Sequence, residues 1–336
     1  MASWRRAVFL GLSGRVINPP VGIAVLGFLI AGCRCSAPEP EEKVLASAVV
    51  PTASSTKPQT LFLPDAQAEL PAAPGVTTAP VYAAGRCAPD MVDVRGEFCI
   101  DRYEVSLVDA VSGQPLSPYY HPSRAQALKS FGFWQGESKL VGSSSARAMP
   151  LPDLPAWQRE REVSPRARSQ RGDIPSGYLS SDLAQTVCER AGKRLCSEQE
   201  WLTACRGEQG RKFPYGDEYR HGACNVFRET HPAQALHQDP SQGHLDPRLN
   251  LVKEGDLPLL KPSGSTPQCA SHWGSDAAYD MVGNLDEWVA ATTDDSTTGK
   301  FLGGFYARAT REGCDAAVSS HAKSYFDYSL GTRCCR

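Results

Sequence analysis

Among the residue types of this chain of 336 residues, cysteine can take part in the widest range of reactions. The 12 cysteines could form disulfides, bind soft metal ions or act as nucleophiles. No two of them form a C-x-x-C pair, which argues against zinc ribbons and thioredoxin-like redox motifs. Such a number is unusual in a cytosolic protein, so disulfides formed in an oxidising compartment are the better interpretation.

Histidines are the second group of potential ligands or bases. The seven histidines form neither H-x-x-x-H nor H-E-x-x-H, so solvated or hydrogen-bonded side chains are expected rather than a metal site. G-x-S-x-G, Walker and G-x-G-x-x-G motifs are also missing, which gives no support to hydrolase, nucleotide-hydrolysing or dinucleotide-binding functions. The formal net charge is -2, and nucleic acid is therefore not expected as a partner.

The N-terminal segment indicates export. Three arginines, at positions 5, 6 and 15, precede the apolar run 21–31, which is shorter than the roughly 20 residues of a membrane-spanning helix but typical of a signal peptide. Residues 30–33 (IAGC) resemble the lipobox of bacterial lipoproteins, which implies that Cys33 is acylated and becomes the mature N-terminus. An ordinary signal peptide with an incidental Cys33 is the alternative. We therefore expect a lipoprotein of the bacterial cell envelope, held at the membrane by its lipid anchor.

The chain then divides into a linker and a folded part. Residues 34–86 are rich in Pro, Ala, Ser and Thr, and such a segment has few large apolar side chains to offset the entropy of ordering it. Residues 87–336 contain ten of the twelve cysteines. An even number permits complete pairing into five bridges, although the sequence alone does not fix which cysteines pair.

Local signals in the folded part predict a hairpin and two helices. Alternation over 90–105 around the turn pair Arg95-Gly96 predicts the hairpin. Leu183, Val187 and Ala191 have helical spacing behind capping residues at 180–182. Ser197 and Glu200 form the capping box of a second helix, 198–205. Residues 113–177 are interpreted mainly as surface loops with one stretch of possible helix, and no long helix is expected beyond Gly207.

Five segments form an ordered set: AGKRLCSEQEWLTACRG (191–207), FPYGDE (213–218), YDMVGNLDEWV (279–289), FLGGFY (301–306) and LGTRCC (330–335). Their order and spacing resemble the formylglycine-generating-enzyme family, also called sulfatase-modifying-factor domains. With IDRYEVS (100–106) as an early strand, the resemblance extends over 87–336. It implies an α+β fold, a variant of the C-type-lectin-like fold that is loop-rich and stapled by disulfides.

The family oxidises a cysteine of a sulfatase to formylglycine with copper and oxygen, and two cysteine thiolates after the Gly-Gly strand bind the copper(I). The corresponding stretch here, 303–314, contains only Cys314. Cys314 fits the family's structural position, with Cys205 as its partner. The two copper positions are then occupied by Arg308 and Ala309, and copper binding is not expected.

The resemblance implies a second bridge, between Cys188 and Cys334. The other cysteines of the folded part are additional to the family pattern. For them we predict the pairs Cys87–Cys99, Cys196–Cys335 and Cys224–Cys269.

Calcium is the cofactor that the resemblance does imply. Asp280, Gly283, Leu285 and Glu287 match family positions that bind Ca²⁺, and Asn225 matches the start of a second calcium site. Side-chain and carbonyl oxygens on a tight turn are the hard ligands that Ca²⁺ prefers. The alternative is that Asp280 and Glu287 only hydrogen-bond the backbone of the turn.

Three functions remain open. The leading hypothesis is an envelope lipoprotein whose domain lacks the copper cysteines and acts as a binding or interaction module, with the peptide groove of the family retained for an exported protein or peptide. The second is a copper- and oxygen-dependent oxidase that modifies a cysteine of an exported protein such as a sulfatase. The third is a structural envelope protein without a small ligand. Fold resemblance alone does not decide among them.

Overall fold

The computed structural model describes residues 86–291 and 297–336. The predicted signal peptide, the predicted acylation site Cys33 and nearly all of the predicted linker lie outside the described residues. Within the described residues, no helix is long and apolar enough to cross a membrane.

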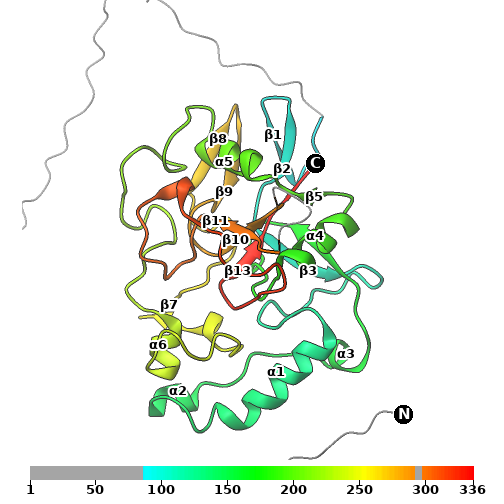
Figure 1. The fold of residues 1–336 in the computed structure, drawn as a ribbon, viewed down its shortest axis with the longest axis vertical. Helices are drawn as coiled ribbons and strands as arrows, with labels where there is room; N and C mark the ends of the chain where they lie inside the picture. Colours follow the sequence, from blue (N-terminus) through cyan, green and yellow to red (C-terminus); the bar gives the residue numbers. More distant parts are fainter. Residues whose placement is uncertain (1–85, 292–296) are drawn as a thin grey trace, which may run out of the picture. The chain divides into compact units, whose positions relative to one another are not determined.

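The described part is built from short elements. The strands are β1 (Met91–Val94), β2 (Phe98–Asp101), β3 (Val105–Asp109), β4 (Pro165–Ser169), β5 (Arg194–Leu195), β6 (Lys253–Glu254), β7 (Leu257–Pro258), β8 (Ala270–Trp273), β9 (Asp276–Tyr279), β10 (Asp286–Val289), β11 (Lys300–Leu302), β12 (Ala317–Val318), β13 (Leu330–Thr332) and β14 (Cys334–Cys335). The helices are α1 (Arg124–Glu137), α2 (Ser144–Ala148), α3 (Ala156–Glu160), α4 (Ser181–Arg190), α5 (Glu198–Arg206) and α6 (Pro232–His237), with 3-10 turns η1 (Leu249–Leu251) and η2 (Gly313–Asp315). Figure 1 places α1, α2, α3 and α6 at the lower end, whereas α4 and α5 lie beside the strands. This mixture confirms the α+β class.

The first sheet has the order β1-β2-β14-β5. Its β1–β2 hairpin turns at Arg95 and Gly96, both of which have a positive φ, as the alternation predicts. Strand β14 inserts between β2 and β5, where Cys335 pairs with Ile100 and Cys334 with Leu195. Residues from the two ends of the folded part therefore share one sheet.

The second sheet has the order β12-β11-β10-β13. Strand β10 lies in its interior, antiparallel to β11 and parallel to β13. All four residues of β10 are buried, so the sheet brings Asp286 and Glu287 into the protein interior.

Helices α4 and α5 begin where the capping residues predict. The Ser180 hydroxyl accepts from the backbone N–H of Leu183. Ser197 and Glu200 form a reciprocal capping box, which satisfies two backbone donors that the first turn of a helix would leave unpaired. Trp201 on α5 is fully buried, as are Trp273 and Trp288.

The segment 113–177, interpreted as mainly loops with one stretch of possible helix, contains more regular structure than expected, because the structure places α1, α2, α3 and β4 there. The sequence did not indicate where α1 begins and ends, because this helix has no continuous apolar stripe. Only Ala127 and Trp134 of its fourteen residues are buried, and Gly132 and Gly136 lower its intrinsic helix propensity.

Five disulfides join all ten cysteines of the described residues. They are Cys87–Cys99, Cys188–Cys334, Cys196–Cys335, Cys205–Cys314 and Cys224–Cys269, and the pairs coincide with those predicted from the sequence. This density of bridges is typical of an extracytoplasmic protein.

Candidate functional site

The segment after β11 holds the positions that the resemblance assigns to copper. It begins with Gly303 and Gly304, which both have a positive φ. A Cβ atom on Gly303 would lie 2.7 Å from the carbonyl oxygen of Met281, so this close approach requires glycine. The N–H of Gly304 donates to the Asp286 carboxylate at 3.1 Å, and the turn is thereby fixed against β10.

Arg308 stands at the first of the two positions that the resemblance assigns to copper. Its Nη2 lies 2.8 Å from Oδ2 of Asp286. The guanidinium also lies over the rings of Phe301 and Phe305, 5.7 and 6.0 Å from their centroids. Burial raises the pKa of Asp286 to about 7, and the charge of Arg308 opposes this rise. The position therefore carries a cation in a salt bridge.

Ala309 and Cys314, the other two residues of this segment that matter for copper binding, carry no free thiol. Ala309, at the second copper position, is exposed and has only a methyl side chain. Cys314, in η2, is bonded to Cys205 on α5. Segment 303–314 therefore presents no free thiolate, the soft ligand that favours copper(I).

The predicted calcium residues lie in one buried region. Asn225 and Gly283 form a parallel bridge, and the N–H of Asn284 donates to the carbonyl of Asn225 at 2.8 Å. Asp280 accepts from the N–H of Gly264 at 2.6 Å. The structure thus brings Asn225 next to the 280–287 turn.

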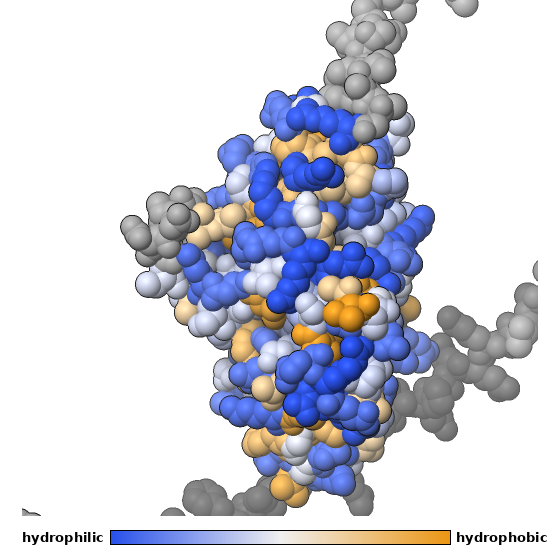
Figure 2. Space-filling view, turned by 90° about the vertical axis from the view of Figure 1, so that its right-hand side faces the viewer, coloured by the Kyte–Doolittle hydropathy of each residue, from blue (hydrophilic) through white to orange (hydrophobic). Residues whose placement is uncertain are grey.

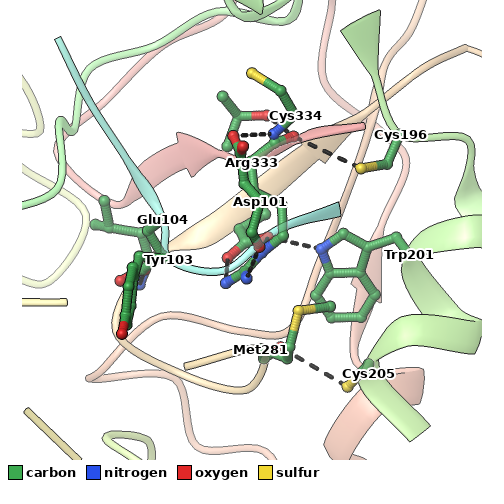
Figure 3. A network of polar contacts seen from close by, with 12 residues as sticks. Asp101, Tyr103, Glu104, Cys196, Trp201, Cys205, Met281, Arg333 and Cys334 are labelled. Atoms are coloured by element: carbon green, nitrogen blue, oxygen red, sulfur yellow. Dashed lines mark hydrogen bonds and ion pairs between the residues drawn. The ribbon is translucent and has the colours of Figure 1, made fainter. Parts of the chain in front are cut away.

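Glu287 has strong protein partners in this region. Its carboxylate accepts from Nε and Nη2 of Arg333, both at 2.7 Å, and from the indole N–H of Trp201 at 2.7 Å. All three side chains are fully or almost fully buried, and the indole of Trp201 points toward this pair (Figure 3). A calcium ion at Glu287 would share the carboxylate with Arg333.

Glu104 is a buried acid that sequence reasoning missed. Its carboxylate accepts from Asn284 Nδ2 at 2.6 Å and from the N–H of Leu285 at 3.0 Å. Burial raises its pKa well above the ordinary value, and the charges of Asp280 and Glu287 raise it further. The signal in the sequence was an acid directly before the first residue of the buried strand β3, within the segment IDRYEVS.

The pKa of the Asp280 carboxyl is also raised. Burial raises its pKa to about 6, against the favourable hydrogen bond from Gly264 and the charge of Arg333. Glu104, Asp280 and Glu287 thus bring three carboxylates near the one guanidinium of Arg333.

This region offers some of the ligands that calcium needs. The Oδ1 atom of Asn225 is buried without a hydrogen-bond partner in the described part of the chain, which leaves a hard oxygen available. No three His, Cys, Asp or Glu side chains of the described residues are placed to hold one metal ion together. Calcium would therefore need the carbonyl and amide oxygens of the turn in addition to its acids.

A second charged cluster stabilises the first sheet. Lys193 donates to Asp90 at 2.6 Å and to Asp101 at 2.5 Å, and Asp101 also accepts from the N–H of Cys334 at 2.9 Å. Burial raises the pKa of Asp101 to about 6 against these bonds. The lysine of the AGKRL segment thus ties the start of β5 to β2, and Asp101 in turn bonds the backbone of Cys334 in β14 (Figure 3).

The chain belongs to the sulfatase-modifying factor enzyme 1-like domain family, whose members match residues 46–336. The match begins within the segment predicted as a linker.

Curated relatives include both inactive and active enzymes. The inactive C-alpha-formylglycine-generating enzyme 2 of Bos taurus is 27% identical over 120 residues, which are 35% of this chain and 33% of the bovine protein. The formylglycine-generating enzyme of Mus musculus is 26% identical over 202 residues, 57% of this chain and 48% of the mouse protein. That of Streptomyces coelicolor is 25% identical over 158 residues, 46% of this chain and 44% of the relative. The chain thus spans less than half the length of these relatives.

The solved structures that align with this chain include PvdO from Pseudomonas aeruginosa, which is 17% identical. The alignment covers 71% of this chain and 80% of PvdO with a TM-score of 0.34.

Proposed function

We propose that this protein is an envelope lipoprotein whose formylglycine-generating-enzyme-like domain is a binding module for an exported protein or peptide and does not oxidise a cysteine. The observation that most strongly supports this proposal is the disulfide between Cys314 and Cys205. It removes the one cysteine of segment 303–314 from the set of available thiolates, and the first copper position carries Arg308 in a salt bridge with Asp286.

The chemistry of the segment supports this proposal further. A guanidinium cannot deprotonate in a protein and is not a copper ligand. Its burial against two aromatic rings and one carboxylate gives a well-defined surface without a reactive atom. The relative named as inactive provides a precedent for a domain of this family without the enzyme's activity.

Thiol counting and a copper assay together test the proposal. The unreduced full-length chain is denatured, its thiols are alkylated, and its bridges are mapped by mass spectrometry. We expect no free thiol among residues 87–336. Copper(I) titration against a chromogenic chelator should give no tight site, and a cysteine peptide from a sulfatase should show no oxygen-dependent loss of its thiol.

A free Cys314 with copper- and oxygen-dependent oxidation of that peptide would overturn the binding-module proposal and establish the oxidase alternative. The same preparation tests the lipid anchor, because acylated Cys33 gives a mass increase on the N-terminal peptide after cleavage. Replacement Cys33→Ser should release the protein from membranes. Retention of Cys33→Ser in the membrane fraction would contradict the anchor.

We further propose a calcium ion bound by Asp280, Glu287 and the carbonyls of Gly283 and Leu285. The excess of acids over the guanidinium of Arg333 supports it, and the unpartnered oxygen of Asn225 would serve the second calcium site. Dialysed protein should retain about one calcium by atomic emission, and chelator should lower its melting temperature. Asp280→Ala should abolish both effects and Asp315→Ala, at an exposed position, neither. Equal melting with calcium and with chelator would contradict the site.

A further inference from the structure

A cavity of about 690 Å³ lies between one face of α1 and the segment 237–245. Its volume falls within the range of roughly 300–1,000 Å³ typical of small-molecule sites. None of its lining residues belongs to segment 303–314 or to the calcium set. The cavity is therefore separate from the site described above.

Helix α1 supplies one continuous face of the cavity. Residues at helical spacings of three and four share a helix face, and the α1 residues that line the cavity follow this spacing. They are Gln126, Lys129, Ser130, Phe133, Trp134 and Glu137. The hydroxyl of Ser130 donates to the carbonyl of Leu245 at 3.1 Å, which ties α1 to the opposite wall.

The walls of the cavity are largely aromatic and aliphatic. Phe133, Trp134 and Phe326 contribute rings, and Val141 and Leu245 contribute aliphatic side chains. Phe133 is 58% exposed and Leu245 is 45% exposed, so apolar surface in this cavity remains open to a ligand. Figure 2 shows hydrophobic colour among the hydrophilic surface at the lower end of the molecule, the height at which Figure 1 places α1.

Lys129 is the one Lys or Arg among the lining residues. Its ammonium group has no hydrogen bond or ion pair with any of the described residues. Glu137 is the one lining carboxylate and lies eight residues further along α1, about 12 Å away at 1.5 Å per residue. The two ends of the cavity therefore have opposite charge, and an anion is favoured only at the Lys129 end.

His237 and His244, which line the cavity, are held by contacts with other groups of the protein. His237 Nε2 lies 3.1 Å from Oδ2 of Asp246, and Asp246 is itself held by Arg248 Nη2 at 2.7 Å. His244 Nε2 lies 3.0 Å from the carbonyl of Pro240. Burial lowers the pKa of His121 to about 4, so its ring is neutral near neutral pH. Lys129 is thus the one Lys or Arg of the lining, and its ammonium has no partner among the described residues.

We propose that this cavity binds a small amphipathic anion, with an aryl or alkyl body between Phe133, Trp134 and Phe326 and a single carboxylate or sulfonate group at Lys129. The body stays within the apolar walls, and the head group keeps clear of Glu137. An ion pair beside apolar surface is worth more than one in open water because the local dielectric constant is lower.

Two fluorescent probes with the same aryl body test this proposal. Anilinonaphthalene sulfonate carries one negative charge, and N-phenylnaphthylamine lacks it. The full-length chain should bind the sulfonate about fivefold more tightly than the neutral amine, which corresponds to about 1 kcal/mol. Lys129→Met should remove this preference and leave the affinity for the neutral amine within about twofold.

Matched variants separate the cavity from general surface binding. Lys139→Met removes an exposed lysine just beyond α1, and Leu140→Ala removes an exposed apolar side chain outside the cavity. Both should leave the two affinities unchanged. Phe133→Ala should weaken both probes about threefold or more, and Glu137→Gln should leave sulfonate binding unchanged or strengthen it. Phe133 and Lys129 are exposed, so these variants should fold, which circular dichroism checks.

Three results would overturn the proposal. The first is a sulfonate affinity no greater than that of the neutral amine. The second is an equal effect of Lys129→Met and Lys139→Met. The third is an affinity for one or both probes that Phe133→Ala leaves unchanged.

Discussion

Arg333 and Glu287 form a two-pronged ion pair in the protein interior, with both nitrogen to oxygen distances at 2.7 Å. The pair joins the segment between β13 and β14 to the central strand β10. Arg333 also donates to the backbone carbonyls of Asp101 and Tyr279. One side chain therefore connects the two sheets and the β8–β9 hairpin.

Replacement of this arginine should be strongly destabilising. Arg333→Met would leave the buried carboxylate of Glu287 without its counter-charge, a change that typically costs about 3–5 kcal/mol. The free energy of unfolding, measured with denaturant on the unreduced protein, checks this expectation. Arg166→Met, at an exposed position, should change stability by less than about 0.5 kcal/mol. Equal stability of the two variants would contradict a structural role for the pair.

The bridge between Cys205 and Cys314 should contribute more stability than the bridge between Cys87 and Cys99. The first closes a sequence separation of 109 residues and the second one of 12. In the chain-entropy model this ratio corresponds to a difference of about 2 kcal/mol. The double alanine variants should differ by this amount in denaturant unfolding. A larger loss from the shorter loop would show that native contacts outweigh chain entropy here.

Protonation of His121 should lower the free energy of unfolding. Burial lowers its pKa from 6.5 to about 4, and its Nδ1 accepts from the N–H of Ser123 at 3.0 Å. As pH falls from 6.5 to 4, the unfolded chain takes up a proton that the folded chain does not, so this contribution to stability is present above pH 6.5 and declines toward pH 4.

His121→Asn keeps an acceptor near the same place and removes the titration. The stability difference between wild type and variant should shift in favour of the variant as pH falls through this window, by no more than about 1.4 kcal/mol per pH unit. Parallel stability curves for the two proteins across the window would contradict the assignment.

The N-cap hydrogen bond of Ser197 should contribute to the stability of the protein independently of the packing of α5. Ser197→Ala removes the hydroxyl that accepts from the N–H of Glu200, which should cost about 1 kcal/mol. Ser197→Thr keeps a hydroxyl that can accept from the N–H of Glu200 and donate to its carboxylate, and it should recover most of that loss. Thermal unfolding of the three proteins measures the order, and a threonine variant as unstable as the alanine variant would contradict capping.

Local signals predicted the elements that are set by neighbouring residues. The capping box at Ser197 and the turn at Arg95-Gly96 depend on contacts a few residues apart, and both occur where the sequence indicates. The pattern of shared motifs indicated the family, and the family model matches residues 46–336.

The features that escaped prediction depend on distant contacts. Glu104 and the N–H of Leu285 are 181 residues apart in the chain, so no local pattern indicates that this acid is buried and bound. Helix α1 has few buried residues, and its cavity exists only because the segment 237–245 packs opposite it. Periodicity cannot reveal an element whose exposed face is itself partly apolar.

The place of β14 between β2 and β5 has a consequence for biosynthesis. A nascent chain that has emerged only as far as residue 320 lacks this strand, the guanidinium of Arg333 and the cysteines that close two of the five bridges. Its first sheet has an unfilled centre, because β2 and β5 are both bonded to β14. The domain thus completes its first sheet only after the strand at residues 334–335 has been synthesised.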